Sequence, residues 1–185
     1  MSKRSKCVVY KYPKPKWSYN LHDVEVQIAA TQAGMVSVTG EHVVRNPART
    51  RTAAAGENSS AVNMKVKHIT VKGCLQNYIS PGATLIVAAI YIPEAFAYTG
   101  QNAAFNNLDT CIFYAHPEWV MAWKRFDYVD ETSDSNEFQL SSGKLCRNLT
   151  PGDSIDLVCI LINRSATNIL NNRIMTTFSY VCRNN

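Results

Sequence analysis

Cations and aromatic residues are interleaved at the start of this chain. The first sixteen residues contain six Lys and Arg side chains and no carboxylate, and Tyr10, Tyr12 and Trp17 lie among or directly after them. Cations that neutralise phosphates release condensed counterions, and aromatic rings stack on unpaired bases. The pattern predicts contact with a single-stranded nucleic acid, without readout of its sequence. The expected contact residues are Lys3, Arg4, Lys6, Lys11, Lys14, Lys16 and Trp17.

The excess of positive charge continues beyond this arm. Residues 1–72 contain 12 Lys and Arg against 4 Asp and Glu, whereas residues 73–185 contain 7 against 10. Lys65 and Lys67 alternate along one face of an expected strand. If that face and the arm lie on the same side, both lysines extend the cationic surface; otherwise they belong to an ordinary solvated face. The arm's composition is also typical of a soluble tail or a nuclear localisation signal.

The residue types used in catalysis are scattered. The four histidines form no HxH or HExxH pair, and no glycine-rich phosphate loop or GxSxG motif is present. His116 and Glu118 are close in sequence, but we expect a strand to point the acid and the base to opposite faces. The six cysteines have no CxxC spacing, and we expect free thiols, mostly buried. The sequence therefore predicts no enzyme, no metal site and no cofactor.

Period-two hydrophobicity dominates the remaining chain and predicts an all-β protein. The apolar parity of residues 64–75 switches near His68, which predicts a β-bulge. Residues 83–92 are continuously apolar, as expected of a strand buried on both faces. Other strands are expected around residues 24–28, 111–114, 119–128, 138–147, 155–161 and 174–182.

Several short strands and long loops favour a two-sheet sandwich, either a jelly roll or an immunoglobulin-like fold. Residues 45–62 and 97–109 are long polar loops, which suit a jelly roll better. We therefore expect a basic, extended arm over residues 1–20 and one jelly-roll domain over residues 21–185. No apolar run is long enough to span a bilayer as a helix, so we expect no membrane insertion.

Aromatic residues are dense between residues 113 and 128. Such rings serve either the core or the buried centre of a protein interface, and the sequence favours neither role. The residues that we assign to a subunit interface are Trp119, Trp123, Phe126 and Tyr128.

Three segments resemble one known family. Leu85 to Glu94 is similar to an apolar strand that ends in a Tyr-Val-Pro-Glu type turn, and Phe113 to Val120 is similar to a Leu-Tyr-x-Pro-x-x-x-Val segment. Ser142 to Leu157 is similar to a Leu-Ser-Arg-Asn-Leu-Asn-x-Gly-Asp element that leads into a core strand. Taken in order, they resemble the capsid proteins of circovirus-like viruses, which have circular, Rep-encoding single-stranded DNA genomes.

This resemblance implies a jelly roll that assembles with itself, typically as sixty copies in a T=1 icosahedral shell. It implies an arm that faces inward onto packaged circular single-stranded DNA, and that often carries nuclear import. The expected locations are therefore the virion and, during assembly, the host nucleus. Two alternatives remain open: a capsid subunit of a small satellite RNA virus, and a receptor- or glycan-binding β-sandwich. The sequence does not identify a host receptor or glycan.

Overall fold

The computed structural model describes residues 16–30, 36–46, 63–75, 83–94, 116–127, 137–163 and 170–184. These residues form nine strands and one short 3-10 turn, η2 (Pro117–Trp119). No helix in the described part of the chain is long and apolar enough to cross a membrane. The strands are β1 (Ser18–Ala30), β2 (Val36–Arg45), β3 (Met64–Leu75), β4 (Ala83–Ile92), β5 (Val120–Phe126), β6 (Glu137–Ser141), β7 (Cys146–Leu149), β8 (Ser154–Asn163) and β9 (Leu170–Asn184).

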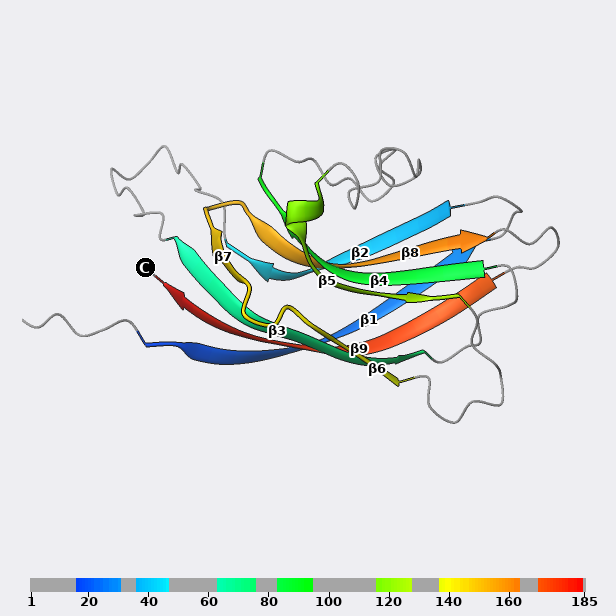
Figure 1. Cartoon of the computed structure of the whole chain (residues 1–185), viewed down its shortest axis with the longest axis horizontal. Helices are drawn as coiled ribbons and strands as arrows, with labels where there is room; N and C mark the ends of the chain where they lie inside the picture. Colours follow the sequence, from blue (N-terminus) through cyan, green and yellow to red (C-terminus); the bar gives the residue numbers. More distant parts are fainter. Residues whose placement is uncertain are drawn as a thin grey trace, which may run out of the picture.

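The strands form two antiparallel sheets stacked face to face (Figure 1). One sheet has the order β1-β9-β3-β6, with β7 also paired to β3, and the other has the order β2-β8-β4-β5. Because β6 and β7 pair with successive parts of β3, they share one edge position. Nine strands thus fill the eight positions of a jelly roll. The predicted all-β jelly roll is confirmed.

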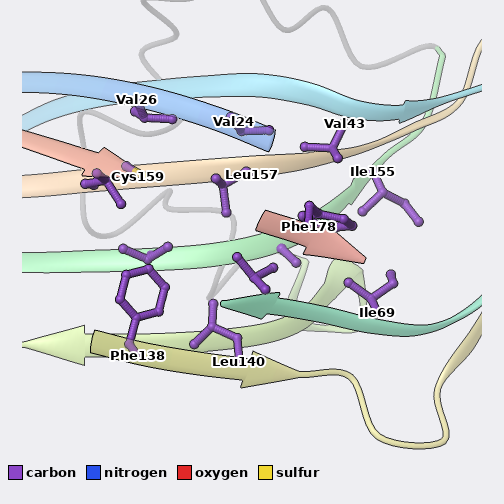
Figure 2. Close-up of a cluster of buried hydrophobic side chains, with 14 of the residues drawn as sticks. Val24, Val26, Val43, Ile69, Phe138, Leu140, Ile155, Leu157, Cys159 and Phe178 are labelled. Atoms are coloured by element: carbon purple, nitrogen blue, oxygen red, sulfur yellow. The ribbon is translucent and has the colours of Figure 1, made fainter. Parts of the chain in front are cut away.

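The core lies between the two sheets (Figure 2). Val24, Val26 and Ile28 point inward from β1, and Phe178 is fully buried on β9. The facing sheet contributes alternate residues of β8, from Ile155 to Leu161. Burying each such side chain stabilises the fold by about 1.5–3 kcal/mol. The period-two pattern thus decides which face of each strand enters the core.

Strands β4 and β8 are buried on both faces, as predicted for residues 83–92. Their outward-facing apolar side chains form a second buried cluster, with Trp119 packed against it. This cluster comprises Ala88, Ile90, Ile92, Val158, Ile160 and Ile162.

The predicted bulge in β3 is confirmed. His68 has a φ of 54°, and the pairing of β3 with β9 shifts between Lys67 and Thr70. The Ile69 amide donates to Ser142 Oγ at 3.0 Å, and the Ser142 amide donates to the Ile69 carbonyl at 2.9 Å. The prediction of one strand over residues 138–147 is wrong. A turn at Gly143, whose φ of 59° favours glycine, separates β6 from β7 opposite this bulge.

Two of the three resembling segments meet at the carboxylate of Asp153, which is 2% exposed. Tyr91 Oη donates to Oδ2 at 2.9 Å, and the Glu94 amide donates to Oδ1 at 3.0 Å. The amide and hydroxyl of Thr150 donate to Oδ2 at 2.7 and 2.8 Å. Gly152, at a φ of 98°, makes the turn, and a Cβ at this position would collide with Glu94. These residues therefore join the end of β4 to the turn before β8.

Candidate nucleic-acid interface

Four of the nine predicted nucleic-acid-binding residues lie in the described part of the chain: Lys16, Trp17, Lys65 and Lys67. The other five, Lys3, Arg4, Lys6, Lys11 and Lys14, lie outside the described residues. The chain enters the five-stranded sheet at Ser18, directly after Trp17. The end of the arm is therefore fixed to the edge of that sheet.

Lys65 and Lys67 point away from the core on the face of this sheet that we call the outer face. Val66 between them is fully buried, so the two lysines share the opposite side of β3. Pairing places Lys65 opposite Arg183 of β9, and Lys67 opposite Val181. Three cations from two neighbouring strands therefore lie together on the outer face.

Trp17 joins this group to the arm. The Lys67 Nζ lies 3.9 Å from the centroid of the indole ring, and the Arg183 Cζ lies 4.8 Å from it. Both separations are within cation–π range. Lys67 and the end of the arm therefore lie on the same side, which was the condition for Lys65 and Lys67 to extend the cationic surface. We call Trp17, Lys65, Lys67 and Arg183 the indole cluster.

Sequence reasoning missed Arg183. A signal was present, because the buried parity of Ile174, Thr176 and Phe178 sends odd-numbered residues of β9 to the outer face. What the sequence did not show is the pairing of β9 with β3, which brings Arg183 beside Lys65.

Two exposed side chains of β1, one aromatic and one aliphatic, lie next to the indole cluster on the outer face. Tyr19 is 66% exposed and Leu21 is 62% exposed. Tyr19 lies opposite Val181, which in turn lies opposite Lys67, so all three share one row of the sheet. An open aromatic ring thus lies two strands from a lysine, an arrangement typical of single-strand binding surfaces.

The other half of the outer face carries three carboxylates together with cations. Asp23, Glu25 and Glu137 line a depression of about 940 Å³ there, together with Lys72, Met175 and Thr177. Arg173 Nη2 donates to Glu25 at 2.8 Å and lowers the pKa of that carboxyl. Thr177 Oγ1 donates to Asp23 at 2.8 Å. Positive charge on the outer face is therefore concentrated at the end from which the arm leaves.

The four aromatic residues assigned to a subunit interface have different environments. Trp123 is 55% exposed on the outward side of edge strand β5. Trp119 packs on the second buried cluster and stacks on His116, with centroids 3.8 Å apart. Phe126 points into the core, where its centroid lies 5.4 Å from that of Phe138. Tyr128 lies outside the described residues. Trp123 is thus the described residue best placed for contact with another subunit.

The expected separation of His116 and Glu118 is wrong. Residues two apart share a face even on a strand, and in the turn η2 the His116 Nδ1 lies 3.2 Å from Glu118 Oε1. Both side chains are largely exposed. The pair therefore closes a surface turn.

A second histidine–carboxylate pair has one buried partner, Asp156, and one exposed partner, His42. His42 Nδ1 lies 2.9 Å from Asp156 Oδ1 and 2.8 Å from Oδ2, and Ser154 Oγ donates to Oδ1 at 2.7 Å. Burial raises the pKa of the Asp156 carboxyl, against the hydrogen bonds from His42 and Ser154. These three residues link edge strand β2 to β8.

No group of three or more metal-ligating side chains occurs among the described residues. Four cysteines of this part of the chain are free thiols. Cys159 is buried as predicted, Cys74 and Cys182 are half-buried, and Cys146 is exposed. Burial raises the pKa of Cys159 to about 12, so this thiol stays protonated.

No protein-family model matches the chain, and no curated protein matches it in sequence. Solved structures that are similar to it include the following three. A maize chlorotic mottle virus structure from single-particle analysis is 8% identical, with 90% of this chain and 93% of that chain covered and a TM-score of 0.37. A decameric BFDV capsid protein is 7% identical, with 91% of this chain and 99% of that chain covered and a TM-score of 0.34. A structure of infectious bursal disease virus Gt strain is 8% identical, with 92% of this chain and 38% of that chain covered and a TM-score of 0.30. The assignment of the jelly roll rests on the strand order given above.

Proposed function

We propose that this chain is a viral capsid subunit. Its copies assemble into a small icosahedral shell, of sixty subunits in the T=1 arrangement, and its basic arm holds circular single-stranded DNA inside. The protein is a structural component of the virion and has no catalytic role. Assembly in the host nucleus and a circovirus-like origin follow from the resemblance of the three sequence segments.

One observation carries this proposal: the jelly roll has a cationic arm fixed to a cationic end of its outer face. The arm supplies six cations in its first sixteen residues. The indole cluster adds Lys65, Lys67 and Arg183 at the end of the arm. A module that binds a neutral glycan has no need for this concentration of positive charge. A subunit that encloses a polyanion does need it.

Self-association is the second part of the proposal. An exposed tryptophan on an edge strand is a common anchor of protein interfaces. Trp123 meets this description, and Arg125 beside it pairs with Asp127 at 2.6 Å. We propose that this outward side of β5 contacts a neighbouring subunit.

The buried carboxylates of the described part have structural roles. Asp153 accepts four hydrogen bonds that fix a turn, and Asp156 links β2 to β8. The hydroxyls that contact them, Thr150 Oγ1 and Ser154 Oγ, donate to the carboxylates at 2.8 and 2.7 Å, within the turn and within β8. These contacts support a structural role for the chain over an enzymatic one.

The cargo tests this proposal. Particles of the full chain should be purified, treated with nuclease from outside, and opened; the released nucleic acid should then be digested separately with DNase and RNase. We expect a protected single strand that only DNase degrades. A protected strand that only RNase degrades would replace the DNA virus with a satellite RNA virus. Particles that contain no nucleic acid would contradict the packaging role.

A further inference from the structure

We propose, on the basis of the proposed function, that the folded body has its own single-strand binding subsite, separate from the cations of residues 1–15. The indole cluster holds backbone phosphates through Lys65, Lys67 and Arg183, and Tyr19 stacks on an unpaired base. The ligand class is single-stranded nucleic acid, and a duplex has no free base for Tyr19.

The placement of the three cations supports phosphate binding. Lys65 and Arg183 are register partners on adjacent strands, which lie about 4.8 Å apart. Lys67 is two residues further along the same face of β3. Within the described residues, none of the three forms an ion pair with a carboxylate. Their mutual repulsion is therefore not offset by an acid of the described residues, and an anion would relieve it.

The Arg183 guanidinium supports the same conclusion independently. Its Nε is buried and has no hydrogen-bond partner among the described residues. Buried donors in folded proteins are nearly always satisfied, so an unpaired one needs an explanation. A guanidinium presents several donors in a planar fork that matches phosphate oxygens. The terminal nitrogens of this fork, rather than the buried Nε, would therefore meet a phosphate on the outer face.

Trp17 and Tyr19 have different roles in this subsite. Trp17 is half-buried, and its ring contacts Lys67 and Arg183, so it positions the two cations. Tyr19 is 66% exposed on the same face and is open to a ligand. Base–aromatic stacking tolerates any base sequence, because every base has a π-face.

The carboxylates of the outer face limit the extent of the subsite. Asp23, Glu25 and Glu137 lie beyond the row of Thr70 and Ser179, so carboxylates border the subsite on that side. Lys72 lies among these acids, on the same strand and the same face as Lys65. Lys72 is therefore a matched control for charge, strand and face.

The test uses the full chain with Lys3, Arg4, Lys6, Lys11 and Lys14 replaced by alanine, below the concentration at which particles form. Fluorescence anisotropy measures binding of a labelled oligo(dT) and of a duplex of the same length. In this background we compare the double variant K65Q/R183Q with K72Q. Circular dichroism confirms that each variant is folded.

We expect the arm-neutral protein to bind the single strand still, and K65Q/R183Q to weaken this binding at least tenfold. The slope of log affinity against log salt should become shallower by about 0.7 for each phosphate that the variant no longer neutralises. K72Q should leave both quantities unchanged. Y19A should weaken single-strand binding about tenfold and leave duplex binding unchanged.

Equal affinities of K65Q/R183Q and K72Q would overturn the subsite. If the chain with an intact arm still binds in that case, the proposed function stands and only the subsite fails. If the chain with an intact arm does not bind the single strand, the proposed packaging role fails. Equal loss of duplex and single-strand binding in Y19A would overturn the stacking role of Tyr19.

Discussion

Tyr91 and Asp153 are 62 residues apart in sequence, and the tyrosine hydroxyl donates to the aspartate Oδ2 at 2.9 Å. The same carboxylate accepts from Thr150 and from the amide of Glu94. Burial, followed by the hydrogen bond to Asp153, raises the pKa of Tyr91 to about 12. The hydroxyl therefore remains a donor throughout the physiological pH range.

D153A should destabilise the fold by about 3 kcal/mol or more, because several buried donors lose their acceptor together. Y91F removes one hydrogen bond and should cost about 0.5–1.5 kcal/mol. Urea unfolding followed by circular dichroism measures both values. Equal losses in the two variants would show that Asp153 does not organise this turn.

G73A should destabilise the fold by about 1–3 kcal/mol through overpacking. A Cβ at Gly73 would lie 2.7 Å from Phe138 Cζ, 2.7 Å from Thr176 Cγ2 and 2.8 Å from the Met175 carbonyl oxygen. Thermal unfolding measures the loss. G73A/F138L should recover part of it, since the smaller side chain leaves space for the methyl group. A G73A protein as stable as the wild type would contradict the close packing of Phe138 over β3.

Asp156 should make the fold less stable as the pH rises. Burial raises the pKa of this carboxyl, so the folded state keeps the proton above the unfolded pKa of about 3.9. In that window the folded chain binds more protons, and the free energy of unfolding falls with increasing pH. We expect the stability of the wild type relative to D156N to decrease as the pH rises above the unfolded pKa. Chemical denaturation at constant ionic strength measures this difference.

Glu25 provides a control of opposite sign. The hydrogen bond from Arg173 lowers the pKa of Glu25, so its stabilising contribution is present above the unfolded pKa and is lost as the pH falls through the folded pKa. The stability of the wild type relative to E25Q should therefore decrease toward acid pH. The same direction of change for D156N and E25Q would refute the assignment of Asp156.

Trp123 should be needed for assembly and dispensable for folding. Its side chain is 55% exposed, so W123A should keep its circular dichroism spectrum and unfolding midpoint while particle formation falls. F126A is the contrasting variant, because Phe126 packs against Phe138 in the core and its loss should destabilise the subunit. Normal assembly of W123A would remove the outward side of β5 from the interface.

Strands with a regular pattern were predictable from the sequence. Residues 64–75 and 83–92 match β3 and β4, because side-chain parity and two-sided burial are local properties. Strand β2 has no such pattern. Its pairing shifts between His42 and Val44, and as a result Val43 and Val44 are both buried although they are adjacent. A bulge in an edge strand thus removes the alternation by which a strand is identified.

Features set by contacts between distant residues were not predictable. The break between β6 and β7 depends on hydrogen bonds between Ser142 and Ile69, 73 residues away. The indole cluster likewise depends on the pairing of β9 with β3. Composition identified Trp17, Lys65 and Lys67 as candidates, but only the sheet register adds Arg183 and places the four residues together.

The mass of the particles decides whether this chain assembles into a shell. Purified full-length chain should be measured by mass photometry at moderate salt, across a wide range of protein concentration. We expect closed particles of sixty 20.6 kDa subunits, about 1.2 MDa of protein plus the mass of the enclosed nucleic acid. A single species at the subunit mass that persists at the highest concentration would contradict the proposed assembly.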